Sequence, residues 1–305
     1  MCLSLPMRLI SNFSAGRFSG DGWASVNDLC VSPKLLGFHL RPHHIRDVIA
    51  SKGKGCTVWA SDIPKCFRRQ RNIPRLLSLF VYLLDNPERG REYFVDLCNP
   101  FGWAPSEYGW QCILAVLMWR LRLDGVRELL AYVDNFFRIF GPDEKPSGEV
   151  KKIMRRLDEA GIELHEIQEG ASFKGLGWWW HLDSMEMKCT EDKKKVFAEL
   201  LSQWAARSPI VMSLAEVRTA VGFMVWLSAG FHVGAAGVAA LVALRSKLEC
   251  VARRKDLSAE AVEGKLSPEQ KETVLFWAKR FPEWSGVCPI VLGFSPVSTW
   301  ETLGQ

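Results

Sequence analysis

Short apolar runs and amphipathic stretches alternate through the first part of the chain. The run "CTVWASDI" (residues 56–63) is rich in β-branched and aromatic residues, which predicts a buried strand that ends at Asp62. Ahead of it, "RPHHIRDVIASKGKG" (residues 41–55) predicts a short helix that stops at a glycine-rich turn. The run "ELLAYVDNFFRIF" (residues 128–140) has the period of paired strands rather than of a helix, so it predicts a hairpin.

Longer elements are predicted on both sides of that hairpin. Residues 91–107 predict a strand, a loop and the entry to a helix, and the long apolar helix itself is expected over Tyr108–Leu123. Residues 149–164 predict an amphipathic helix that stops at Gly161, with a strand beyond it. The fold class expected from this succession is α+β.

All elements predicted after Thr190 are helical. Two of these helices open on Ser-x-x-Glu/Gln capping boxes, at Ser213–Glu216 and at Ser267–Gln270. The chain is therefore expected to divide near residue 190, with a mixed α/β part over 1–190 and a helical part over 191–305.

One apolar stretch within the helical part raises the question of a membrane. Residues 219–244 form a run of 26 residues without Lys, Arg, Asp or Glu, which is long enough to cross a bilayer. Four glycines and His232 interrupt the run, and no second span accompanies it. Two buried helices joined near Gly230 are therefore favoured over a membrane span.

Composition and charge exclude few classes of protein. With 305 residues, 48% hydrophobic and 24% charged, the chain has the balance of a soluble globular protein. The net charge of +5 is compatible with a polyanionic partner. Nine cysteines without a CxxC pair argue against a disulfide framework or a zinc site, and the N-terminus has no long apolar core. We therefore expect reduced thiols and an intracellular location, in the cytoplasm or the nucleus.

Candidate chemistry lies at two predicted strand ends. Asp62 and Asp134 are separated by 134 − 62 = 72 residues. Two carboxylates from distant segments suit Mg²⁺, which prefers oxygen ligands and completes its shell with water and phosphate. The spacing alone leaves open a plainer alternative, in which Asp62 ends a strand and Asp134-Asn135 caps backbone groups of a turn.

Three short motifs surround these aspartates in a fixed order. "DIPKCF" starts at Asp62, "NPFGWAPS" at Asn99 and "YVDN" at Tyr132. Their succession, D-x-x-x-C-F, P-F-G-W-x-x-S and Y-x-D-N, resembles the palm of reverse transcriptases. Further stretches, among them 7–30 and "FKGLGWWWHLDSMEM" (173–187), extend the resemblance over about residues 7 to 290. Together they look most like the reverse transcriptases of DIRS-type, tyrosine-recombinase retrotransposons.

This resemblance implies a right-hand polymerase with partial fingers, a palm carrying an antiparallel sheet and a helical thumb and connection, without a ribonuclease H domain. The implied activity is RNA-directed DNA synthesis, in which two metal ions assist nucleotidyl transfer to a primer 3′-hydroxyl. The implied cofactor is Mg²⁺, with Mn²⁺ as an alternative ion. The implied partners are an RNA or DNA template-primer and deoxynucleoside triphosphates.

The resemblance also implies roles for individual residues. Asp62, Asp134 and the backbone of Ile63 would hold the metal ions, and Asn135 stands where the family has a second aspartate. Phe67 would act as a steric gate against a 2′-hydroxyl. The remaining implied contacts are Arg8, Ile63, Phe101 and Gly102 for the nucleotide, and Gly177 and Trp178 for the primer grip.

Plainer interpretations stand beside these roles. Phe67 and Phe101 are equally compatible with core aromatics. Arg68, Arg69 and Arg71 are slightly better explained by a solvated face than by a template contact. The run Trp178–Trp180 cannot point one way on a strand, so one or two of its indoles should be buried while the other faces a partner or nucleic acid.

The sequence departs from the family pattern at four places. They are Asn135 in the Y-x-D-D position, Glu107 in place of a proline, Glu166-Ile167 where a lysine is usual, and the apolar stretch 219–244. All four weaken the case for catalysis, so a catalytically inactive nucleic-acid-binding remnant of such a polymerase is the alternative. Template preference and oligomeric state stay open.

Overall fold

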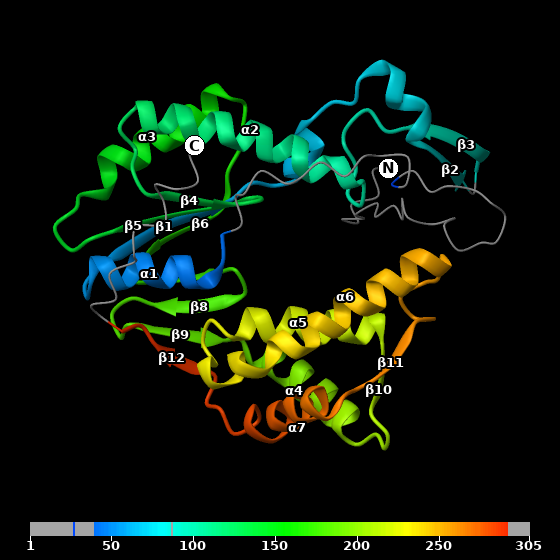
Figure 1. Ribbon diagram of the computed structural model, residues 1–305. Helices are drawn as coiled ribbons and strands as arrows, with labels where there is room; N and C mark the ends of the chain where they lie inside the picture. Colours follow the sequence, from blue (N-terminus) through cyan, green and yellow to red (C-terminus); the bar gives the residue numbers. More distant parts are fainter. Residues whose placement is uncertain (1–26, 28–39, 87, 292–305) are drawn as a thin grey trace. The chain divides into compact units, whose positions relative to one another are not determined.

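The computed structural model describes residues 27, 40–86 and 88–291 (Figure 1). Helices are combined with antiparallel strand pairs, which confirms the α+β class. The chain forms two compact units that alternate along the sequence. Among the described residues, the first comprises 27, 61–86, 88–136 and 147–167, and the second comprises 40–60, 137–146 and 168–291. The division predicted near residue 190 stays a prediction.

A four-stranded sheet holds the predicted strand and the predicted hairpin. Its order is β4-β5-β1-β6, with β1 at Thr57–Asp62, β4 at Leu129–Tyr132, β5 at Asn135–Phe140 and β6 at His165–Gly170. The middle of β1 and nearly all of β5 are buried, which explains why both are rich in apolar residues. Arg138 of β5 is buried as well. The hairpin expected over 128–140 is confirmed.

The first unit also contains helix α2, all of helix α3 but its first residue, and a separate strand pair. Their bounds are Ala104–Leu123 for α2, Pro146–Glu159 for α3, Val81–Asn86 for β2 and Gly90–Val95 for β3. Helix α2 begins before the predicted Tyr108, because Pro105 fits a first turn, where no amide hydrogen bond is needed. Past the end of α3, Gly161 has φ +66°, in the left-handed region that favours glycine, as predicted for the stop.

The second unit contains helix α1 (Pro42–Lys52) and a sheet of order β12-β9-β8-β7. Its strands are β7 at Ser172–Gly175, β8 at Trp178–His181, β9 at Glu186–Cys189 and β12 at Val287–Pro289. Trp178 and Trp180 are fully buried, whereas Trp179 is 41% exposed. The expectation that one or two of the three indoles are buried while the other is not is confirmed.

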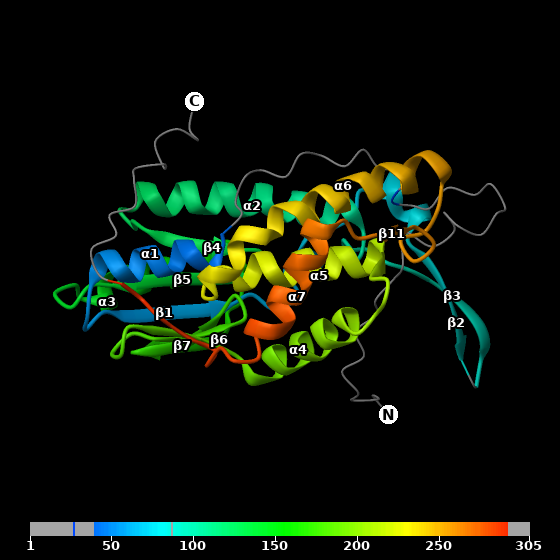
Figure 2. The same ribbon diagram turned by 60° about the horizontal axis from the view of Figure 1, so that its bottom comes forward.

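The second unit also contains the helices α4, α5, α6 and α7 (Figure 2). They are α4 at Glu191–Ala205, α5 at Leu214–Leu227, α6 at Val238–Lys255 and α7 at Pro268–Arg280; α5 packs on α6, and α4 on α7. Both predicted capping boxes are present, at Ser213 and Ser267. The prediction that every element after Thr190 is helical was wrong, because short strands β10 (Val211–Ser213), β11 (Glu263–Lys265) and β12 also form. Three-residue strands depend on distant partners and leave no local signal.

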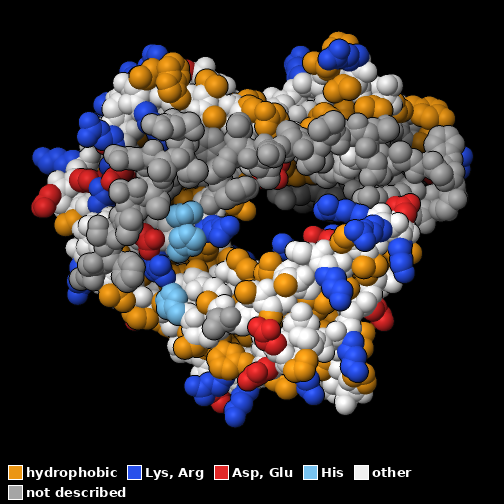
Figure 3. All heavy atoms as spheres, in the orientation of Figure 1, with side chains coloured by type: hydrophobic (Ala, Val, Ile, Leu, Met, Phe, Trp, Pro, Cys, Tyr) orange, Lys and Arg blue, Asp and Glu red, His pale blue; other side chains and the backbone are white. Residues whose placement is uncertain are grey.

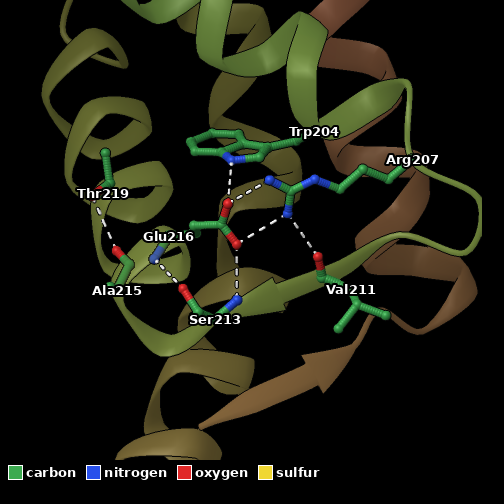
Figure 4. Close-up of polar contacts among 7 residues, drawn as sticks. All are labelled: Trp204, Arg207, Val211, Ser213, Ala215, Glu216 and Thr219. Atoms are coloured by element: carbon green, nitrogen blue, oxygen red, sulfur yellow. Dashed lines mark hydrogen bonds and ion pairs between the residues drawn. The ribbon is translucent and has the colours of Figure 1, made fainter. Parts of the chain in front are cut away.

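Charged side chains lie at the end of α6 and at the start of α5. Lys and Arg gather at the end of α6 (Figure 3), where Arg253, Arg254 and Lys255 form the last turn and complement the helix dipole. At the start of α5, Glu216 accepts hydrogen bonds from the Ser213 amide at 2.9 Å and the Trp204 indole at 3.3 Å, and pairs with Arg207 (Figure 4). One carboxylate thus ties the end of α4 to the start of α5.

The apolar stretch 219–244 is divided among α5, a 3-10 helix at His232–Gly237 and α6. The two buried helices expected on either side of Gly230 are therefore confirmed. None of the helices in the described ranges is long and apolar enough to cross a membrane. Two glycines of the stretch leave room for aromatic rings: a Cβ on Gly234 would lie 2.7 Å from Trp277 Cε2, and one on Gly230 would lie 2.7 Å from Trp178 Cη2.

Candidate active site

Asp62 and Asp134 lie at neighbouring strand ends of the first unit. Asp62 is the last residue of β1, and Asp134 lies in the turn between β4 and β5. The backbone N–H of Ile63 donates to the carbonyl oxygen of Asp134 at 2.7 Å. This hydrogen bond brings the backbone next to Asp62 against the backbone of Asp134, although the two aspartates are 72 positions apart in the sequence.

The Cys66 thiol is affected by both aspartates. Its pKa is raised to about 12, first by burial and then by the negative charges of Asp134 and Asp62. Both carboxylates therefore lie within electrostatic range of one buried sulfur. In the sequence, Cys66 was noted only as one residue of the D-x-x-x-C-F motif, and nothing in the local pattern indicated that its thiol would lie near both aspartates.

The turn that carries Asp134 is held in an uncommon conformation. Val133 has φ +51°, a left-handed value that is strained for a β-branched residue. The indole of Trp110, on α2, donates a hydrogen bond to the Val133 carbonyl oxygen. Trp110 thus fixes the turn from outside the hairpin. It was missed in the sequence, because one tryptophan on an apolar helix carries no signal of such a contact.

Asn135 interacts with Asp134 directly. Its side-chain nitrogen Nδ2 donates to Asp134 Oδ1 at 2.7 Å. The amide therefore engages one oxygen of the neighbouring carboxylate and adds no negative charge of its own. Where a second aspartate would repel Asp134, Asn135 stabilises it.

The residues at this site offer hard oxygen donors. Within the described ranges, no group of three or more His, Cys, Asp or Glu side chains is arranged to hold a metal ion. Mg²⁺, however, is commonly held by one or two carboxylates together with substrate phosphates and water. The donor set of Asp62 and Asp134 fits that mode of binding, in which the substrate supplies part of the shell.

Two predicted nucleotide contacts lie together near this site. Phe67 belongs to the 3-10 helix Cys66–Arg69 that follows Asp62, and its ring lies 5.2 Å from that of Phe101 in an edge-to-face arrangement. Both rings are half-buried, and Gly102, next to Phe101, is exposed and has φ +89°. The Gly102 carbonyl accepts a hydrogen bond from Asn27 at 2.9 Å. Arg8, the remaining predicted contact, lies outside the described residues.

Gln70 organises the loop that carries Phe101, a role that no sequence pattern indicated. Its side-chain oxygen accepts from Asn99 Nδ2 at 3.1 Å, and its nitrogen donates to the Ser106 carbonyl at 3.2 Å. The Ser106 hydroxyl donates to the Pro100 carbonyl at 2.8 Å, which closes the loop on itself. These bonds hold the loop and the start of α2 together.

Two of the arginines that follow Phe67 interact with other residues of the chain. Arg68 pairs with Asp96, and Arg69 donates to the Gly161 carbonyl at 2.8 Å and lies 3.8 Å from Glu163. Arg71 is exposed. Two of the three arginines therefore have structural partners, which were not anticipated by either interpretation of the run.

Glu107, Glu166 and Ile167, which depart from the reverse-transcriptase motifs, lie in different surroundings. Glu107 accepts from Gln111 at 3.2 Å, and its charge, after burial and ahead of Asp134, raises the pKa of Tyr132. Glu107 therefore adds negative potential beside the Y-x-D-N turn. Glu166 and Ile167 lie exposed on β6.

The predicted primer-grip residues belong to the second unit. Leu176 and Gly177, with φ of +50° and +82°, form the turn between β7 and β8. The Trp226 indole donates to the Leu176 carbonyl at 2.9 Å, and Lys193 lies over the Trp226 ring at 4.7 Å. Trp178 is buried with its ring 4.9 Å from that of Trp226. Lys193 and Trp226, which support the turn from α4 and α5, were not found from the sequence.

Comparisons with known proteins give one kind of match. No protein family and no curated protein matches the sequence. Among solved structures, the foamy viral protease-reverse transcriptase in complex with an RNA/DNA hybrid is similar, with 15% identity, 82% of this chain covered and a TM-score of 0.47. The foamy viral protease-reverse transcriptase dRH in complex with double-stranded DNA is also similar, with 13% identity, 82% of this chain covered and a TM-score of 0.48. This chain spans 30% and 39% of those two chains.

Proposed function

We propose that the chain is a template-directed polymerase of the reverse-transcriptase kind, with the sheet β4-β5-β1-β6 as part of its palm. The observation that carries the proposal is the hydrogen bond from the Ile63 N–H to the Asp134 carbonyl, which brings together the aspartates of two motifs. The order of the three motifs along the chain supports it. An origin in a DIRS-type retrotransposon is part of the proposal and rests on the sequence motifs alone.

In the proposed reaction, the 3′-hydroxyl oxygen of the primer attacks the α-phosphorus of a deoxynucleoside triphosphate, and pyrophosphate leaves. Asp62 and Asp134 would hold Mg²⁺, which when bound stabilises charge on the attacking and leaving oxygens. Phe67, braced against Phe101, would lie under the sugar and exclude a 2′-hydroxyl. The Leu176–Gly177 turn would hold the primer end through its backbone.

Asn135 favours a second candidate function, a nucleic-acid-binding protein that has lost catalysis. The Asn135 amide engages Asp134 Oδ1 and contributes no charge, so attraction for a divalent cation should be weaker than with two aspartates. Glu166 and Ile167 offer no cation for the leaving pyrophosphate. In this alternative the chain binds template without extending a primer.

Primer extension on an RNA template, with Mg²⁺ and then with Mn²⁺, tests the proposal. We expect extension by the unaltered chain, and its loss in Asp62→Asn and Asp134→Asn. Asp192→Asn, on the exposed first turn of α4, is the matched control and should retain extension. Extension that survives both palm substitutions would refute the assignment of the site. No extension with either ion, combined with recovery in Asn135→Asp, would establish the inactive alternative.

A further inference from the structure

The sheet of the second unit presents a row of basic and aromatic side chains on one face. Lys174 on β7 is directly opposite Trp179 on β8, and Trp179 is directly opposite Lys188 on β9. Directly opposed residues in an antiparallel sheet point to the same face, so a lysine stands on each side of the indole. The alternate residues of β8, Trp178 and Trp180, are buried on the other face.

This face is open within the part of the chain that the structure describes. Trp179 is 41% exposed, Lys174 is exposed and Lys188 is half-buried. Among the described residues, neither lysine takes part in an ion pair. An exposed indole flanked on both sides by lysines combines the two features that single-strand binding surfaces use, an aromatic ring for a base and cations for the flanking phosphates.

The next row of the same face extends the aromatic surface. The His181 ring lies nearly parallel to the Trp179 ring, with an interplanar angle of 16° and centroids 6.5 Å apart. Glu186 is opposite His181 and accepts a hydrogen bond from the Ser184 hydroxyl at 3.2 Å. The face therefore carries one carboxylate at its margin, beside two lysines and two aromatic rings.

We propose that this face binds single-stranded nucleic acid, with a base stacked on Trp179 and the flanking phosphates on Lys174 and Lys188. Neighbouring strands are roughly 4.8 Å apart, so the two lysines arise about 10 Å from each other with the indole between them. Stacking on an aromatic side chain requires an unstacked base, which a single strand offers and a duplex does not. An acidic polypeptide would satisfy the lysines but would leave the indole unused. The surface needs neither Asp62 nor Asp134 and is independent of the proposed catalysis.

The test is fluorescence anisotropy of a labelled oligothymidylate of about ten nucleotides, titrated with the full chain in EDTA at several salt concentrations. Trp179→Ala should weaken binding at least about fivefold, and Trp179→Phe should retain most of it. Lys174→Glu/Lys188→Glu should reduce the slope of log affinity against log salt by about 1.4, since each phosphate contact of a single strand contributes about 0.7. Glu186→Gln should strengthen binding.

The matched control is Lys195→Glu/Lys271→Glu, which makes the same change in net charge at exposed positions of α4 and α7. It should leave the salt slope unchanged. Absence of binding by the unaltered chain, equal binding by Trp179→Ala, or equal losses in the two lysine pairs would overturn the proposal. Because EDTA removes divalent ions, failure here says nothing about the palm, and primer extension by Trp179→Ala is measured separately. Circular dichroism melting of every variant shows that each one is folded.

Discussion

The side-chain amide of Asn135 donates a hydrogen bond to the carboxylate of Asp134 at 2.7 Å. Asn135 stands where the reverse-transcriptase motif Y-x-D-D has its second aspartate, and it is hydrogen-bonded to the residue in the place of the first, Asp134. In this arrangement the amide lowers the negative potential at the site and also limits the freedom of the Asp134 carboxylate. The consequence for a divalent cation can be measured by restoring the charge.

Asn135→Asp should lower the Mg²⁺ concentration for half-maximal primer extension by on the order of tenfold, because a second carboxylate adds charge next to Asp134. Calorimetric titration with Mn²⁺ provides a readout that does not depend on activity. Asn135→Ala removes the amide without adding charge and serves as the control. If Asn135→Ala and Asn135→Asp bind Mn²⁺ equally well, charge at this position does not govern the site.

Cys66 should resist alkylation in the folded protein. Its thiol pKa of about 12, raised by burial and by Asp134 and Asp62, leaves almost no thiolate at about pH 8. Exposed Cys250 should react with iodoacetamide under the same conditions. Peptide mass spectrometry after timed quenching measures both rates. Reaction of Cys66 as fast as that of Cys250 would show that this sulfur is neither buried nor close to the aspartates.

Gly234→Ala should lower the free energy of unfolding by about 1–3 kcal/mol, because the new methyl group would overlap the buried Trp277 ring. Gly222→Ala is the contrasting variant. It lies inside α5 with nothing within 4 Å of an added Cβ, so the better helix propensity of alanine should raise stability by about 0.5–1 kcal/mol. Denaturant unfolding of both variants measures the difference. Equal effects would contradict the packing of Trp277 on Gly234.

Glu216 should make stability depend on pH. The hydrogen bond from Arg207 holds the pKa of Glu216 below its ordinary value of 4.5. A carboxyl with a lowered folded pKa contributes stability that is present above the unfolded pKa and lost as pH falls through the folded pKa. Glu216→Gln should therefore cost about 1 kcal/mol near neutral pH, and the difference from the unaltered chain should shrink below pH 4.5. Thermal unfolding across that range tests it; a difference independent of pH would mean that the capping geometry alone matters.

Local pattern predicted the elements well where the physical cause is local. The β4–β5 hairpin, the helix stop at Gly161 and the capping boxes at Ser213 and Ser267 follow from periodicity and from hydrogen bonds spanning three or four residues. Strands β10 and β11 were missed, since each consists of three residues whose partner lies about fifty positions away.

The sequence by itself determined the order of the motifs, the burial of most apolar runs and the division of Trp178–Trp180 between two faces, because these depend on residue type and on the period of a strand or helix. Only the tertiary structure decided which distant groups meet. The hydrogen bond between Ile63 and Asp134 and the row of Lys174, Trp179 and Lys188 depend on strand order and register. The hydrogen bond from Trp110 to Val133 depends on where helix α2 packs. Register is set by the packing of the whole sheet, and no short segment contains that information.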